Sequence, residues 1–170
     1  MHSRDNIIRL FRALNEKLKA REVIGEVGIC GGAVMCLVFR ARATTKDVDG
    51  IFKPTKEIRE ASQEAAHELG ASSHWLNDAA KAYFHVDPPQ EDILHLSNLR
   101  VWAPSADYML AMKCISARYD SHDKEDVQFL IRYLGLKHPK EVFRIVEKYY
   151  PRRIIPAKTR FLIEELLEDS

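Results

Sequence analysis

The N-terminal segment interleaves charged and apolar residues with the period of an α-helix. Its apolar residues recur at intervals of three and four positions: Ile7, Ile8, Phe11, Leu14 and Leu18. Side chains spaced in this way lie on one side of a helix and form an amphipathic stripe. We therefore predict that a helix over residues 5–20 opens the fold.

A strand, a turn, a helix and a second strand are predicted next. Residues 23–30 are rich in β-branched residues and glycine and run into Gly31-Gly32, which predicts a strand that ends in a turn. Residues 33–42 follow as a predicted helix. Residues 47–52 alternate polar and apolar side chains and stop before a proline, so we predict a second strand beside the first.

The middle of the chain predicts one long helix and two shorter elements. Residues 56–69 have helical spacing and end at Gly70, a residue type that commonly follows the last turn of a helix. A short helix is predicted near residues 73–82, and a strand with a turn over residues 93–102.

The last third of the chain is predicted to be helical. For a helix over residues 105–117, Ser105 is a suitable N-cap and Asp107 suits the positive end of the helix dipole. Three further helices are expected over residues 122–134, 139–149 and 156–168.

This order of elements predicts an α+β fold, in which a small mixed sheet with flanking helices precedes a helical C-terminal half. A chain of 170 residues is long enough for one compact domain. We expect a single domain over residues 1–170, with its α/β core at about residues 1–104 and its helical part at about residues 105–170.

The composition argues against a membrane protein and against a disulfide-stabilised one. No apolar run approaches the roughly 20 residues needed to cross a bilayer, and the N-terminal segment does not have the pattern of a signal peptide. Cys30, Cys36 and Cys114 lack the C-x-x-C spacing of metal and redox sites, so we expect them to be buried and reduced. These features predict a soluble cytoplasmic protein with no membrane partner.

The formal net charge of +1 is unevenly distributed along the chain. Residues 137–160 contain eight Lys or Arg against two Glu, a local balance of +6. Within them, residues 149–153 (Tyr-Tyr-Pro-Arg-Arg) mix aromatic rings with cations, as RNA-binding surfaces do. The alternative is that these cations belong to ordinary solvated helix faces.

Asp47 and Asp49 are the first candidates for a chemical role. Residues two apart in a strand point to the same face, so the two carboxylates would lie side by side while Val48 faces the other way. Mg²⁺ in phosphate-binding sites usually takes one or two carboxylates, with water and phosphate oxygens as its other ligands. The alternative is an exposed Asp-x-Asp at a turn.

Gly31 and Gly32 are the second candidates, because a glycine pair between a strand and a helix lets backbone N–H groups approach a phosphate closely. An ordinary tight turn explains a single Gly-Gly equally well. If the two predicted strands are neighbours, the glycine turn lies beside the carboxylates.

Lys113 and Asp126 are the third pair of candidates. One turn from Lys113, on the same side of its predicted helix, lie Met109 and Leu110, so its ammonium group needs an anion if it is buried. Either a triphosphate or a carboxylate such as Asp126 can supply that anion. Alternatively, the lysine stem packs on the core while its head reaches water. Asp126 borders the core face of the next helix and is a candidate general base, although acidic residues there also favour the helix dipole.

Four short motifs occur in order along the chain: Gly31-Gly32-Ala33-Val34-Met35, Thr45-Lys46-Asp47-Val48-Asp49, Leu110-Ala111-Met112-Lys113 and Asp123-Lys124-Glu125-Asp126-Val127. Together they resemble the polymerase-β-like nucleotidyltransferase superfamily, specifically its abortive-infection-type and toxin-type branch and related uncharacterised bacterial proteins. The resemblance covers roughly residues 20–135.

The resemblance implies a minimal nucleotidyltransferase fold and a site that uses an NTP with Mg²⁺ or Mn²⁺. It implies that Asp47 and Asp49 bind the metal and are catalytic together with Lys113 and Asp126. It also implies that Gly31, Gly32, Lys46 and Lys113 bind the nucleotide. In the toxin-type branch, a cognate antitoxin-like protein is a further possible partner.

The chain departs from the superfamily pattern at two points. Where many members have serine as the second residue of the glycine motif, this chain has Gly32, which removes a hydroxyl contact to phosphate. Many members also have a third carboxylate on a later strand, for which Asp78 and Asp92 are the candidates here.

These observations predict a metal-dependent nucleotidyltransferase that moves a nucleoside monophosphate from an NTP to an acceptor hydroxyl. An RNA or tRNA end is the favoured acceptor because of the basic segment and the toxin-type resemblance; a protein or a small molecule stays open. The rival hypothesis is a catalytically inactive nucleotide- or partner-binding module on the same fold, which the unplaced third carboxylate favours.

Overall fold

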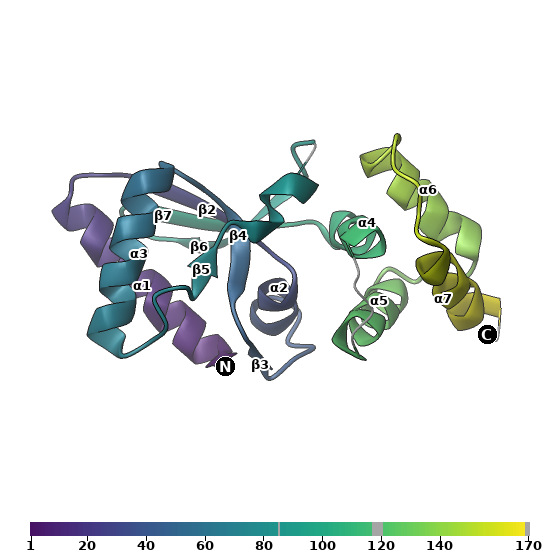
Figure 1. Ribbon diagram of the computed structural model, residues 1–170, viewed down its shortest axis with the longest axis horizontal. Helices are drawn as coiled ribbons and strands as arrows, with labels where there is room; N and C mark the ends of the chain where they lie inside the picture. The colour runs from purple at the N-terminus through teal and green to yellow at the C-terminus, as the bar shows by residue number, and fades with distance from the viewer. Residues whose placement is uncertain (85, 117–120, 169–170) are drawn as a thin grey trace. The chain divides into compact units, whose positions relative to one another are not determined.

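The computed structural model describes residues 1–84, 86–116 and 121–168. The chain forms two compact units, coloured along the sequence in Figure 1. Unit 1 comprises residues 1–82 and 90–104, and unit 2 comprises residues 83–89 and 105–170. The fold is mixed: within the described ranges there are seven α-helices, one five-stranded mixed sheet and one two-stranded sheet.

Unit 1 is built on the five-stranded sheet, whose strand order is β5-β4-β2-β7-β6. The strands are β2 (Gly25–Cys30), β4 (Val48–Lys53), β5 (Leu76–Asn77), β6 (Gln90–His95) and β7 (Leu99–Pro104). The central strand β2 pairs antiparallel with β4 and parallel with β7. The predicted adjacency of the first two strands is therefore confirmed.

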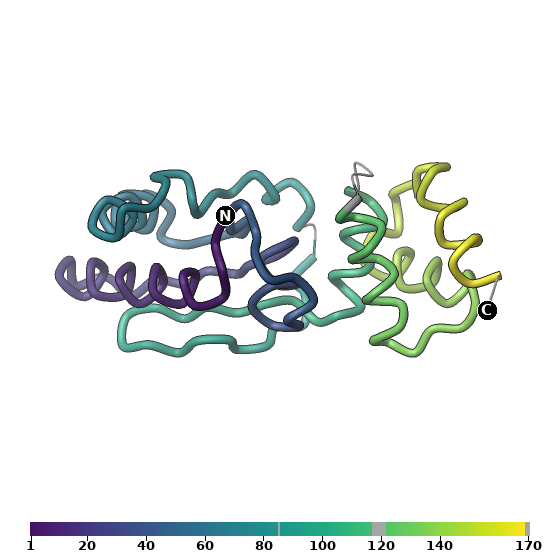
Figure 2. The backbone as a smooth tube through the Cα atoms, turned by 90° about the horizontal axis from the view of Figure 1, so that it is seen from below, coloured from purple at the N-terminus to yellow at the C-terminus, as the bar shows by residue number. Residues whose placement is uncertain are grey.

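Two long helices, α1 (Arg4–Ala20) and α3 (Thr55–Leu69), pack against each other and run side by side in Figures 1 and 2. Both contact the sheet on the same face, because a Cβ at Gly25 of β2 would meet Leu18 of α1 and Ile58 of α3. As predicted, α3 is capped by Gly70, which adopts the left-handed conformation with φ of +66°.

Short elements at the ends of β2 and β4 differ from the prediction. The helix expected over residues 33–42 is limited to α2 (Gly32–Leu37), since Arg40 has a φ of +54° that an α-helix does not accommodate. Arg4 Nε donates to the Leu37 carbonyl at 3.3 Å at the end of α2. The two-stranded sheet, β1 (His2–Ser3) with β3 (Thr44–Thr45), was not predicted.

The helix predicted over residues 73–82 is wrong. The chain instead forms β5 and then the 3₁₀-helix η1 (Ala79–Tyr83). Trp75 explains the difference: its buried indole N–H donates to Ser62 O at 3.0 Å, and its carbonyl accepts from Val48 N at 2.7 Å. These two bonds bring the backbone to the sheet edge, where β5 pairs in parallel with β4. Residues 93–102, expected to be a strand with a turn, belong to the β6–β7 hairpin.

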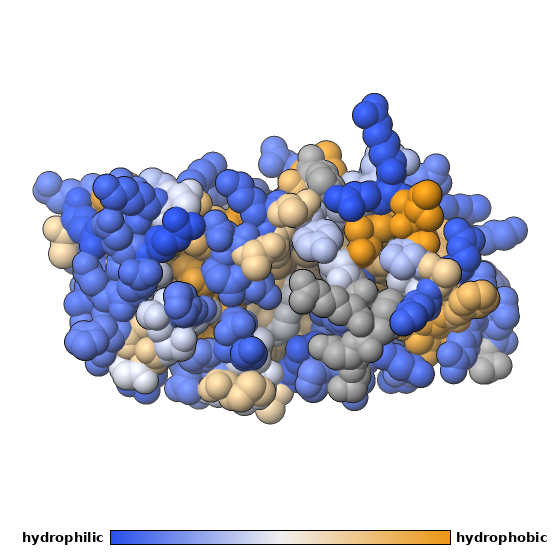
Figure 3. All heavy atoms as spheres, in the orientation of Figure 1, coloured by the Kyte–Doolittle hydropathy of each residue, from blue (hydrophilic) through white to orange (hydrophobic). Residues whose placement is uncertain are grey.

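Among its described residues, unit 2 contains four helices: α4 (Ala106–Ser116), α5 (Ser121–Tyr133), α6 (Pro139–Tyr149) and α7 (Ala157–Glu168). Their positions confirm the predicted helices, except that residue 117, the last of the first one, lies outside the described residues. Tyr108 is fully buried, with its ring centroid 4.9 Å from that of Tyr149. Figure 3 shows hydrophobic residues at the surface of unit 2. The apolar side chains of Ile154 and Phe161 in this unit are largely exposed.

Candidate functional site

The first part of the candidate site is the corner at which β2 ends. Gly31 follows Cys30 with a φ of +63°, a backbone conformation that favours glycine. Cys30 pairs with Asp49 of β4, and a Cβ atom at Gly31 would lie 3.7 Å from Asp49 Oδ2. The structure therefore brings the glycine pair and one of the two predicted carboxylates together.

Gly32 completes this corner and reveals a residue that the sequence analysis missed. A Cβ atom at Gly32 would lie only 2.9 Å from Arg42 Nη1 and 2.8 Å from Thr45 Oγ1. Glycine thus permits a guanidinium group and a hydroxyl group to contact the backbone here. Arg42 was predicted only as the end of a helix, and no periodic pattern marks it, because its position depends on the chain leaving α2 early.

Asp47 has different surroundings from Asp49. It directly precedes β4, and its carbonyl accepts a bond of 3.1 Å from Thr45 Oγ1. Both aspartates are half-buried, while Val48 between them is fully buried in the core, as the strand alternation predicted. Asp47 and Lys46 line a cavity of about 480 Å³ that also includes His2 and Arg9. Burial and the N-terminal ammonium group lower the pKa of His2, and the charge of Asp47 opposes them.

The carboxylates near this corner can hold a metal ion only if a bound ligand supplies further oxygen atoms to that ion. In the described ranges, no group of three or more His, Cys, Asp or Glu side chains is arranged to hold a metal ion. An ion bound to triphosphate needs fewer protein ligands, because Mg²⁺ takes one or two carboxylates and completes its octahedron with phosphate oxygens and water. Asp49, beside the bare Gly31, satisfies this smaller requirement, with Asp47 two residues before it.

Lys113 and Asp126 lie in unit 2, whereas the glycine pair, Lys46 and the two aspartates lie in unit 1. Lys113 Nζ bonds to Asp123 Oδ1 and to Asp126 Oδ2, both at 2.9 Å, and its side chain is only 11% exposed. Asp126, together with Asp123, therefore supplies the anion that a buried ammonium group needs. Burial lowers the pKa of Lys113, but the two carboxylates outweigh burial and raise it overall.

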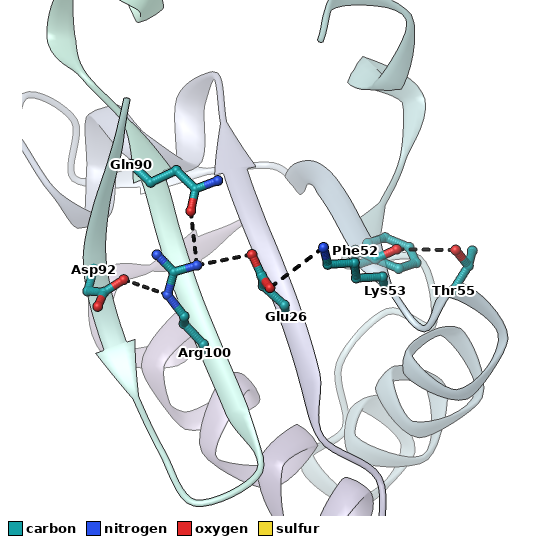
Figure 4. Close-up of polar contacts among 7 residues, drawn as sticks. All are labelled: Glu26, Phe52, Lys53, Thr55, Gln90, Asp92 and Arg100. Carbon is teal, nitrogen blue, oxygen red and sulfur yellow. Dashed lines mark hydrogen bonds and ion pairs between the residues drawn. The ribbon is translucent and has the colours of Figure 1, made fainter. Parts of the chain in front are cut away.

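Each candidate for a third carboxylate contacts an arginine. Asp78 Oδ2 lies 3.1 Å from Arg59 Nη2, and Asp92 Oδ1 lies 2.7 Å from Arg100 Nε. Arg100 also donates to Glu26 Oε1 at 3.0 Å and to Gln90 Oε1 at 2.9 Å, which joins β6, β7 and β2 across the sheet (Figure 4). Asp92 thus belongs to an interstrand polar network.

The two aromatic residues of segment 149–153 are not available to stack on bases. Tyr149 and Tyr150 are 6% and 2% exposed, respectively. Tyr149 OH donates to Asp107 Oδ2 at 2.8 Å, and Tyr150 OH donates to Tyr83 O at 2.6 Å. The interpretation of this segment as a mixed aromatic and cationic RNA-binding surface is therefore wrong in its aromatic part.

Comparisons with protein-family models, curated proteins and solved structures give no match for this chain. Across the described ranges, none of the helices combines the length and the apolar character needed to traverse a bilayer.

Proposed function

We propose that the chain has the minimal nucleotidyltransferase fold and transfers a nucleoside monophosphate from an NTP to an acceptor hydroxyl, with an RNA or tRNA end as the favoured acceptor. The observation that supports it best is the corner after β2, where the Asp49 carboxylate faces Gly31 and the Arg42 guanidinium lies against Gly32. A carboxylate suits a divalent ion, and a guanidinium suits phosphate oxygens. Both charges flank a stretch of backbone without side chains.

In this proposal, Asp49 and Asp47 would hold Mg²⁺ or Mn²⁺, which when bound neutralises charge on the triphosphate. Gly31 and Gly32 leave room for phosphate oxygens near the backbone, and Arg42 donates hydrogen bonds to them. The acceptor oxygen bonds to the α-phosphorus as the bond from that phosphorus to pyrophosphate breaks, and the hydroxyl proton passes to a base. The catalytic roles of Lys113 and Asp126 stay predictions.

The test measures NTP binding first and transfer second. The melting temperature should rise when millimolar NTP and Mg²⁺ are added, and an Asp47→Ala/Asp49→Ala variant should lose that rise. A matched control, Glu165→Ala/Glu168→Ala, removes two exposed acids from α7 and should keep it. Label from the NTP should then appear on RNA only with the intact aspartate pair. A melting temperature unchanged by any NTP would refute the proposal.

One observation favours a second candidate function, the non-catalytic nucleotide- or partner-binding module. Lys113 and Asp126 are bonded to each other, and both candidates for a third acid contact arginines. These side chains thus have structural partners without any substrate. NTP binding that depends on the aspartate pair, with no transfer to RNA, protein or small-molecule acceptors, would support the module over the enzyme.

A further inference from the structure

Three cations form a row along α6. Lys140, Arg144 and Lys148 are spaced four residues apart and are all exposed, Lys148 to 65%. Residues at this spacing lie one above another on the same side of a helix, about 6 Å apart along its axis. The opposite side of α6 is buried in unit 2 through Val142 and Val146. Core packing therefore fixes which side of the helix presents the charges.

The start of α6 is also fixed. Glu141 Oε2 accepts from the backbone N–H groups of Lys137 and His138 at 2.7 and 2.8 Å, and these bonds lower the pKa of the Glu141 carboxyl group. One of the two acids in this basic segment therefore serves as a helix cap. Glu147 is the other acid, so the exposed charge along α6 is mainly positive.

Further cations continue beyond the row. Arg152 and Arg153 are exposed immediately after α6, and the Arg160 guanidinium of α7 lies over the Phe143 ring of α6, 4.7 Å from its centroid. The surface thus offers several separate single charges, on α6, immediately after it and on α7, and the charge of Lys148 lies 3.9 Å from Asp107 Oδ2. This arrangement suits a polymer with many regularly placed anions better than one small anion, which would need converging donors.

The burial of side chains around α6 also limits the class of partner that this surface can bind. Tyr149 and Tyr150 are buried, so the surface lacks their rings as stacking platforms for bases. The apolar side of α6 faces the core, so the helix cannot insert that side into a lipid surface. What the cations along α6 offer is contact with phosphates, which positions a nucleic acid without reading its sequence.

We propose that the α6 row, Lys140, Arg144 and Lys148, binds the phosphate backbone of a nucleic-acid strand without sequence preference. This inference rests on the proposed function, because the bound strand would be the acceptor of the transferred nucleoside monophosphate. Neutralisation of phosphates releases condensed counterions, so the binding constant should fall as the salt concentration rises. The slope of its logarithm against the logarithm of the salt concentration is proportional to the number of phosphate contacts.

The experiment measures fluorescence anisotropy of labelled 20-nucleotide RNA and DNA strands of mixed sequence, titrated with the whole chain at several salt concentrations. Replacing the row by Lys140→Gln/Arg144→Gln/Lys148→Gln should weaken binding at least about tenfold and reduce the log–log salt slope by about 2, since each single-strand contact contributes roughly 0.7. Two RNA sequences of equal length should bind equally.

The matched control, Arg12→Gln/Lys19→Gln/Lys56→Gln, removes the same charge from exposed positions of unit 1 and should change binding less than twofold. Equal weakening by both triple variants would overturn the proposal, as would stronger binding to phosphatidylserine vesicles than to either strand. Tighter binding of RNA than of DNA would identify RNA as the strand, and no binding of either strand would refute the proposed binding surface.

The same variants separate this inference from the proposed function. Strand binding without label transfer would support the α6 row as a binding surface and refute the nucleotidyltransferase activity. Label transfer together with unchanged strand binding by the α6 triple variant would support the activity and refute the α6 row.

Discussion

Lys113 places an ammonium group in the interior of unit 2, where two carboxylates compensate for its lost hydration. Asp123 and Asp126 each lie 2.9 Å from its Nζ atom, and Asp126 is 2% exposed. Removing one member of a buried ion pair leaves its partner charged in a poorly solvated place. The three residues should therefore contribute to stability as a unit, whatever part they take in catalysis.

We predict that Lys113→Met lowers the free energy of unfolding by about 3–5 kcal/mol, because it leaves two adjacent carboxylates without their cation. Urea denaturation followed by circular dichroism measures this change. Lys56→Met, at an exposed position of α3, is the matched control and should stay within about 0.5 kcal/mol of the wild type. A loss below about 1 kcal/mol for Lys113→Met would show that the charges are better solvated than the structure indicates.

At the scale of elements, Asp107 ties the start of α4 to the end of α6. Its carboxylate accepts from the Ser105 hydroxyl, from Tyr108 N at 2.8 Å and from Tyr149 OH at 2.8 Å. Burial acts to raise the pKa of Asp107, but these hydrogen bonds and nearby Lys148 outweigh burial and lower it below 3.8. A carboxyl group with a lowered folded-state pKa stabilises the fold above its ordinary pKa and loses that effect as pH falls through the folded value.

The resulting prediction concerns how the stability of the fold changes with pH under acidic conditions. Asp107→Asn should be less stable than the wild type at pH 6, and the difference should shrink as pH falls below about 3.8, because the wild-type carboxyl group then becomes neutral too. Melting temperatures between pH 2.5 and pH 6 measure it. Asp87→Asn, at an exposed position, should follow the wild type throughout. A constant difference across this range would contradict the assigned role of the charge.

At the scale of the whole molecule, the chain forms two units, and each has a core of its own. Val27, Ile29 and Val48 are fully buried in unit 1, and Val127 and Leu130 are fully buried in unit 2. Units with separate cores open with separate free energies when few contacts join their cores.

We predict that the Lys113→Met substitution lowers the protection of amides from hydrogen exchange in unit 2 but not in unit 1. Amide protection should fall in α4 and α5, while peptides from β2 and β4 keep wild-type protection. Hydrogen-exchange mass spectrometry under native conditions distinguishes this from a uniform loss over both units. A uniform loss would show that the chain unfolds as one cooperative unit.

The sequence by itself determined most of the helices and the central strand pair. Periodicity located α1, α3, α5, α6 and α7 to within one residue at either end, because each helix buries a continuous apolar stripe whose spacing is visible in the sequence. It also indicated the Gly31-Gly32 corner and the neighbouring Asp49. These features depend on residues close together in the chain.

Only the tertiary structure decided which distant groups meet. The short strands β1, β3 and β5 have too few residues to show a period, and each exists because a partner strand is near it. The burial of Tyr149 and Tyr150, the partners of Lys113 and the approach of Arg42 to Gly32 likewise depend on packing between segments. Local spacing carries no information on such contacts, since each is fixed by the path of the chain between the residues that meet.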